Sequence, residues 1–185
     1  MPSDAVLHQA AALCLTYPDD DLQARLSLLR EAAPQLREFV DHAALTPVRE
    51  LAAHYVEVFD PEGLHSLYLS RWTDGGDAGR LGRAAEGVPF EDLYRRHGLE
   101  FTGEERPDFL PAVLEYAART GDTEPLTRHR EGLERLRSRL AGLRTPYASV
   151  LDAVCAILPT VCTSAPTVRT TPTTVRTTPP TAYIP

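Results

Sequence analysis

The stretch Arg-Pro-Asp-Phe-Leu-Pro-Ala-Val-Leu-Glu-Tyr-Ala, residues 106–117, decides the fold class because a proline fixes a helix start within it. Pro111 has no N–H and its ring clashes with the carbonyl four residues earlier, so it fits only the first turn of a helix. The helix is therefore predicted to begin near Asp108, whose side chain can cap the free N–H groups that follow. Apolar residues then recur at helical spacing and are expected to face the core: Leu110, Val113, Leu114 and Ala117.

Signals of helix starts recur along the chain, whereas the alternation typical of strands does not. Thr46-Pro47 and Thr145-Pro146 each place a capping residue before a proline at the first helical position. Other helices are predicted over 4–16, after 19–21, over 77–86 and over 89–97. One long helix is predicted over 123–143, with a heptad-like leucine seam at Leu126, Leu133, Leu136, Leu140 and Leu143. Pairs of opposite charge flank that seam at a spacing of four: Arg130 with Glu134, and Glu131 with Arg135.

The length and charge of the chain exclude some classes of function and favour others. The chain has 185 residues, which suggests one domain, and its formal net charge is −7. That charge disfavours nucleic acid and stable membrane association but suits a basic polypeptide partner. All 19 basic residues are arginine, so a phosphate loop with its lysine and a Schiff-base lysine are both excluded.

Residue types that carry catalysis or bind metals are scattered along the chain. The six histidines form no metalloprotease pair, and Cys14, Cys155 and Cys162 lack zinc-ligand spacing. There is neither a nucleophile elbow nor a dinucleotide fingerprint. We therefore expect no catalytic residues, no metal site and no enzymatic activity. The N-terminal apolar run is not typical of a signal peptide, and no stretch has the length of a membrane span, so a cytoplasmic location is expected.

The composition changes abruptly after Pro159. Thr-Val-Arg-Thr-Thr-Pro occurs at 167–172 and again at 174–179. Repeated proline and threonine without apolar periodicity cannot offset the entropy of ordering. The prediction is an all-α helical bundle over residues 1–159, followed by a disordered Pro/Thr-rich tail over 160–185.

Two stretches, residues 54–60 and 106–117, resemble in this order the NarJ-type nitrate reductase assembly chaperones of the wider TorD-like family. Residues 55–60 match the family's Tyr-x-x-x-Phe-Asp pattern, and residues 94–98 match a Tyr-x-x-x-Gly helix ending. Residues 107–111 match Pro-Asp-His-Leu-Pro, followed by Leu-Glu-Tyr at 114–116. Phe109 stands where the family usually has histidine, so any polar role of that histidine is absent or altered here. The resemblance covers roughly residues 10–158.

The resemblance implies an all-helical cytoplasmic chaperone, a monomer or weak dimer, with no permanently bound cofactor. Its implied partner is the catalytic (alpha) subunit of a respiratory nitrate reductase, bound through a leader-like N-terminal segment. Binding would hold the apo subunit open for insertion of the molybdenum cofactor and delay membrane attachment. Two alternatives stay open: a TorD-like chaperone for a different molybdoenzyme, and a helical adaptor or regulator without a metalloenzyme client.

Acidic residues gather around the second stretch, with five carboxylates and one arginine over 100–116. Glu57, Asp60 and Glu62 add to them if the two stretches meet in space. We hypothesise a groove whose apolar floor takes one face of a client helix while the acids meet its basic residues. Its predicted client-binding residues are Tyr55, Phe59, Asp60, Asp108, Phe109, Leu110, Glu115 and Tyr116. Core packing is the competing role for the four apolar positions Tyr55, Phe59, Leu110 and Tyr116, and helix capping is the competing role for Asp108.

Overall fold

The computed structural model of the protein describes residues 3–59, 64–72, 90–99 and 105–159. Across these ranges the chain forms α-helices and two short 3-10 turns, and the β-structure is a single antiparallel bridge between Tyr68 and Phe109. The predicted all-α class is confirmed. The helices are α1 (Asp4–Leu15), α2 (Asp20–Ala32), α3 (Arg37–Leu45), α4 (Val48–Phe59), α5 (Phe90–Arg96), α6 (Leu110–Thr120), α7 (Glu124–Arg128), α8 (Arg130–Gly142) and α9 (Tyr147–Ile157), with turns η1 (Pro34–Leu36) and η2 (Leu69–Trp72).

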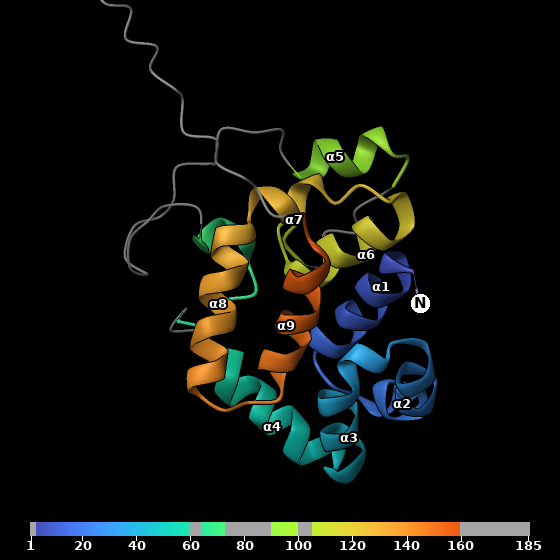
Figure 1. The fold of residues 1–185 in the computed structure, drawn as a ribbon, viewed down its shortest axis with the longest axis vertical. Helices are drawn as coiled ribbons and strands as arrows, with labels where there is room; N and C mark the ends of the chain where they lie inside the picture. The colour runs from blue at the N-terminus through green and yellow to red at the C-terminus, as the bar shows by residue number, and fades with distance from the viewer. Residues whose placement is uncertain (1–2, 60–63, 73–89, 100–104, 160–185) are drawn as a thin grey trace, which may run out of the picture.

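Helix α1 lies at the centre of the bundle, packed along α6 and also against α9, while α8 lies on the other side of α9 (Figure 1). Its alanines and leucines are buried around most of the helix rather than along one stripe. A helix that is apolar on most sides belongs inside a core. The small alanines let neighbouring helices approach closely, so α1 holds the others together. Cys14 and Cys155 are buried free thiols within this core.

Helix boundaries follow the predicted start and stop signals at most positions. Asp19 caps α2 by accepting the N–H of Leu22 at 2.8 Å, and Pro111 lies in the first turn of α6. Gly121 ends α6 in the left-handed region at φ 75°, a conformation that glycine adopts without a steric penalty. The predicted helix over 89–97 is α5, and the one over 77–86 lies outside the described residues.

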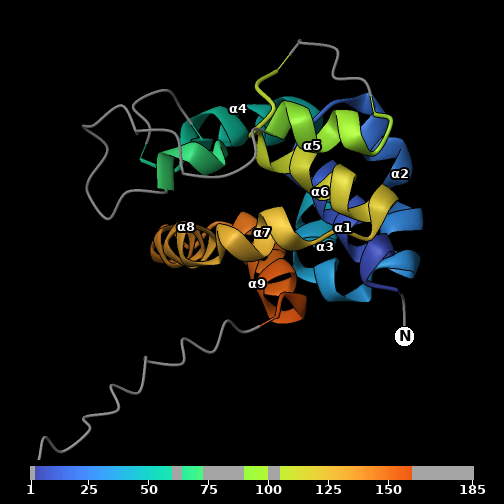
Figure 2. The same ribbon diagram turned by 90° about the horizontal axis from the view of Figure 1, so that it is seen from above.

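The prediction of one continuous helix over 123–143 was wrong. The helix divides at His129 into α7 and α8, which run in different directions (Figures 1 and 2). The buried His129 ring donates from Nδ1 to the carbonyl of Pro125 at 2.8 Å and packs against Phe90. A side chain that competes for a main-chain acceptor in this way interrupts the regular ladder. Leu143 follows the end of α8 and is exposed, whereas the other four seam leucines are buried.

Two predicted helix caps have other roles. Phe109, not Asp108, holds the N-cap position of α6, and the Asp108 carboxylate turns instead toward η2. Thr145 does not cap α9, because its hydroxyl lies 2.8 Å from Nε2 of His54 and joins α4 to the start of α9. Both side chains make long-range contacts that outweigh the local preference.

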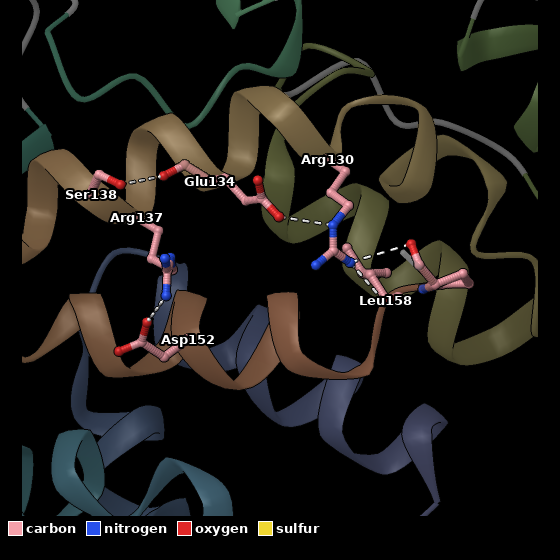
Figure 3. A network of polar contacts seen from close by, with 7 residues as sticks. Arg130, Glu134, Arg137, Ser138, Asp152 and Leu158 are labelled. Carbon is pink, nitrogen blue, oxygen red and sulfur yellow. Dashed lines mark hydrogen bonds and ion pairs between the residues drawn. The ribbon is translucent and has the colours of Figure 1, made fainter. Parts of the chain in front are cut away.

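Polar contacts along α8 fix the end of α9 (Figure 3). Arg130 pairs with Glu134 at 2.8 Å, and its Nη1 donates to the carbonyls of Leu158 at 2.6 Å and Pro159 at 3.3 Å. Arg137 reaches Asp152 on α9 at 2.9 Å. Because the last carbonyls of a helix lack partners within it, Arg130 satisfies one end of α9 and fixes the direction in which the chain leaves. The predicted tail over 160–185 lies outside the described residues and stays a prediction.

Candidate functional site

A groove of about 390 Å³ opens where the turn between α1 and α2, one face of α4, and the segments 66–71 and 105–109 meet. We call it the aromatic groove because five of its ten lining residues carry aromatic rings. Those five are Tyr17, Tyr55, Phe59, Tyr68 and Phe109, and the other five are Thr16, Ser66, Leu67, Arg71 and Glu105.

One wall of the aromatic groove comes from α4. Tyr55 donates its hydroxyl to the carbonyl of Leu15 at 3.1 Å, which fixes α4 to the end of α1. Its ring packs edge-on against Tyr17 at 5.6 Å and lies 4.8 Å from Phe59. Burial, with a smaller contribution from Glu105, raises the pKa of the Tyr55 hydroxyl, so it stays a donor at neutral pH. Tyr55 and Phe59 are half-buried in this wall, whereas Tyr17 is 55% exposed.

The opposite wall depends on pairing between two short extended segments. Leu110 donates its N–H to the carbonyl of Leu67 at 2.8 Å, and Leu69 donates to the carbonyl of Asp108 at 3.0 Å. These bonds flank the antiparallel bridge between Tyr68 and Phe109, whose rings lie 5.5 Å apart. Side chains on directly opposed residues of such a pair lie on the same face. The bridge therefore presents both rings together.

Asp108 supports this wall from inside and is 5% exposed. Its Oδ2 accepts the main-chain N–H of Ser70 at 3.1 Å, and its Oδ1 lies 3.2 Å from Nε of Arg106. Arg106 also lies over the ring of Tyr68, at 5.3 Å from its centroid. A carboxylate already engaged by two donors is poorly placed to meet a client. The geometry therefore favours a positioning role for Asp108, through the backbone that carries Tyr68.

Charged groups of both signs line the aromatic groove. Glu105 is exposed and accepts the hydroxyl of Tyr68 at 3.0 Å, while Arg71, also exposed, lines the groove as its basic group. Burial and this hydrogen bond raise the pKa of Tyr68. The groove thus offers apolar ring faces, a carboxylate and a guanidinium, which suits noncovalent recognition of a peptide.

The structure brings three of the eight predicted client-binding residues to the groove lining, namely Tyr55, Phe59 and Phe109. Leu110 is fully buried in the core. Glu115 is paired with Arg119 on the outside of α6, and Asp60 lies outside the described residues.

Tyr116 is also away from the aromatic groove. It is 2% exposed, packs against Tyr94 of α5 and donates its hydroxyl to Asp122 at 2.8 Å. The prediction had omitted Tyr17 and Tyr68. Tyr17 stands beside a proline and Tyr68 within a short apolar stretch, but nothing in the sequence indicates that both line one groove.

Comparison with known proteins identifies the family. The family model described as nitrate reductase delta subunit matches residues 23–152. The chain belongs to the nitrate reductase delta subunit family. The matched region of this delta-subunit family member contains every lining residue of the aromatic groove except Thr16 and Tyr17. The predicted resemblance to NarJ-type chaperones is confirmed.

Relatives of this delta-subunit family member carry related names. It is 37% identical over 118 residues to the nitrate reductase-like protein NarX of Mycobacterium tuberculosis H37Rv, covering 61% of this chain and 18% of NarX. It is 31% identical over 121 residues to the nitrate reductase molybdenum cofactor assembly chaperone NarJ of Escherichia coli K12, covering 60% of this chain and 50% of NarJ. The chain thus spans half or less of these two relatives.

A solved structure supports the fold of the delta-subunit family member. The crystal structure described as a redox enzyme maturation protein from Archaeoglobus fulgidus superimposes with a TM-score of 0.62 at 18% identity. The alignment covers 82% of this chain and 91% of that one. At this identity the likeness establishes a shared helical fold.

No helix among the described residues is both long enough and apolar enough to span a bilayer. In the same parts of the chain, no three histidine, cysteine, aspartate or glutamate side chains come together as a metal site.

Proposed function

We propose that this chain is an assembly chaperone that binds the catalytic subunit of a respiratory nitrate reductase and holds it competent for molybdenum cofactor insertion. Membership in the nitrate reductase delta subunit family carries the proposal, together with the name of the NarJ relative. The client contact is an N-terminal segment of that subunit, bound before membrane attachment. The chaperone acts in the cytoplasm as a monomer or weak dimer, is not an enzyme and keeps no cofactor of its own.

The aromatic groove supplies a physical basis for holding a client. An amphipathic helix or extended segment can lay its apolar side chains on the rings of Tyr55, Phe59 and Phe109. Tyr17 and Tyr68 close the groove from either side. Aromatic rings contribute large contact areas with few rotatable bonds, so little entropy is lost on binding. Reversible burial of this kind needs no covalent step.

The groove that we propose for the client is lined by one acidic and one basic residue, and is less acidic than the groove predicted from the sequence. Asp108 and Glu115 are held in ion pairs within the chaperone, so they do not face a client in this geometry. Glu105 and Arg71 remain at the lining, and their opposite signs fix the direction of a bound segment more than its affinity. A client with a basic residue near one end of its apolar stretch matches this arrangement.

Calorimetric titration of the full chain with the N-terminal peptide of the host's nitrate reductase catalytic subunit tests the proposal. A scrambled peptide of equal charge is the control for nonspecific attraction. Saturable binding of the native peptide alone supports the proposal. If the peptide of another molybdoenzyme binds and the nitrate reductase peptide does not, the client assignment is wrong. Binding of neither peptide contradicts the chaperone role at this segment.

Alanine variants of two exposed residues, one inside and one outside the groove lining, test whether the client binds in the aromatic groove. Tyr17→Ala removes a groove ring that is 55% exposed, whereas Leu45→Ala removes a side chain that is 87% exposed at the end of α3, outside the groove lining. Neither change should disturb the core. We expect Tyr17→Ala to weaken client binding by roughly tenfold, as for an aromatic contact worth about 1–2 kcal/mol. Leu45→Ala should leave it unchanged, and equal effects would place the client elsewhere.

A further inference from the structure

We propose that a Val-Arg-Thr-Thr-Pro repeat from residues 160–185 docks in the aromatic groove of its own chain and competes there with the client. The competition with a client rests on the proposed function, whereas the docking itself depends only on the groove and the repeat. The proposed occupant is a segment of the same chain, so its charge, proline content and length can be compared with the groove.

The charge of the segment complements that of the helical bundle. Residues 160–185 contain Arg169 and Arg176 and no acidic residue. All 26 acidic residues lie within 1–159, and the same range contains only 17 arginines. The segment is therefore a cation tethered to an anionic body, and mutual attraction favours contact at low ionic strength.

The aromatic groove has the character of a site for proline-containing peptides. Such peptides favour the polyproline II conformation, which lacks internal hydrogen bonds and docks between aromatic rings. The wall of Tyr17 and Tyr55 and the wall of Tyr68 and Phe109 provide these rings. Five prolines occur over residues 160–185, two of them ending the repeats at 172 and 179.

The two charged lining residues match the polar parts of the repeat. Glu105 keeps its second carboxylate oxygen, because Tyr68 bonds only Oε2, and a carboxylate suits the guanidinium of Arg169 or Arg176. Arg71 offers N–H donors, and a polyproline II backbone presents unpaired carbonyls to such donors. The two arginines of the repeats are seven residues apart, and each is followed by the same Thr-Thr-Pro sequence.

The point of departure and the length of the segment allow the second repeat to reach the groove. Arg130 holds the carbonyls of Leu158 and Pro159 against α8, so the chain leaves from a fixed point (Figure 3). Arg176 lies 17 positions after Pro159, a distance of up to about 55 Å when the chain is extended. A compact body of 159 residues is about 40 Å across. Tethering gives the repeat an effective concentration on the order of 1 mM, so even weak docking populates the groove.

The docking is tested on the full chain with a nitroxide attached at Thr173→Cys, between the repeats, and with Cys162→Ser to leave one reactive thiol. Cys14 and Cys155 are buried and stay unchanged. We expect paramagnetic broadening of amide signals at Tyr17, Tyr68 and Phe109. Broadening should disappear with Arg169→Glu/Arg176→Glu. Broadening that is absent from the groove, or uniform over the surface, would overturn the proposal.

A matched pair of charge reversals separates docking from general attraction. Glu105→Arg changes the groove, and Glu131→Arg changes the net charge equally at an exposed position on α8. We expect broadening at the groove to be lost in the first variant and kept in the second. Equal loss in both would contradict specific docking.

Competition is measured by adding the client peptide to the labelled chain. Displacement of the broadening supports the competition, and the tail variant Arg169→Glu/Arg176→Glu should then bind client about two- to fivefold more tightly. If the client peptide binds without displacing the tail, the competition is refuted. If the peptide does not bind at all while groove broadening persists, the proposed client fails and the docking stands.

Discussion

Replacing Asp108 by alanine tests whether this carboxylate supports the wall of the aromatic groove from within. The change removes the acceptor of the Ser70 N–H and the partner of Arg106 while leaving the backbone bridge between Tyr68 and Phe109 able to form. We expect the variant to lose stability because the main-chain N–H of Ser70 loses this charged acceptor in a partly buried wall.

The size of that loss follows from the surroundings of each partner. Removing the charged acceptor of the Ser70 N–H costs about 1–3 kcal/mol. The Arg106 side chain is 61% exposed, so water replaces its lost ion pair and the further cost stays below about 1 kcal/mol. The sum of about 1–4 kcal/mol lowers Tm by about 2–4 °C for each kcal/mol in a domain of this size.

Thermal and urea unfolding followed by circular dichroism measure this change. Asp108→Asn keeps an oxygen acceptor and should lose only about 1 kcal/mol, and Glu115→Ala, which breaks an exposed ion pair on α6, should lose less than that. If Asp108→Ala is as stable as Glu115→Ala, the positioning role is refuted. A client affinity that falls further than the loss of stability explains would instead return Asp108 to the binding surface.

Three further changes have defined outcomes. Gly132→Ala would bring a methyl group against Cβ of Trp72, so we expect a loss of about 1–3 kcal/mol in thermal unfolding, whereas Gly142→Ala on the open side of α8 should be neutral or stabilising. The Tyr147 hydroxyl is buried without a partner among the described residues, so Tyr147→Phe should keep or raise the urea midpoint; a loss above about 1 kcal/mol would imply a hidden partner. Burial lowers the pKa of His8, against an opposing contribution from Asp4, so the unfolded chain takes up a proton more readily as pH falls through 6.5. Stability is therefore lost below that pH, and His8→Leu should shrink the difference between urea midpoints at pH 7.5 and pH 5.5.

Local chemistry in the sequence predicts the helices well where a single residue forces a boundary. Pro111 and Gly121 leave few options, and α6 begins and ends as these residues require. His129 breaks the predicted long helix although no local signal marks it, because the cause is a buried ring position set by Phe90 on another helix. Contacts of this kind are determined by packing and are not visible in periodicity.

The aromatic groove was predicted only in part for the same reason. Tyr55 and Phe59 share one face of α4, which their spacing of four residues already indicates. Their opposition to Phe109 depends on the bridge to Tyr68, a pairing across 41 residues with no sequence signature. Tyr116 belongs to the same stretch as Phe109, but it lies on a different side of α6 from Leu110 and packs on α5, away from the groove.

The origin of the groove walls has a consequence for when binding first becomes possible. The rings come from positions 17, 55, 68 and 109, and each is held by a main-chain group or ring from a distant part of the chain. A chain emerging from the ribosome with only its first hundred residues has one wall and no opposite face. Under the proposed function, client capture therefore begins only after Phe109 has joined the fold.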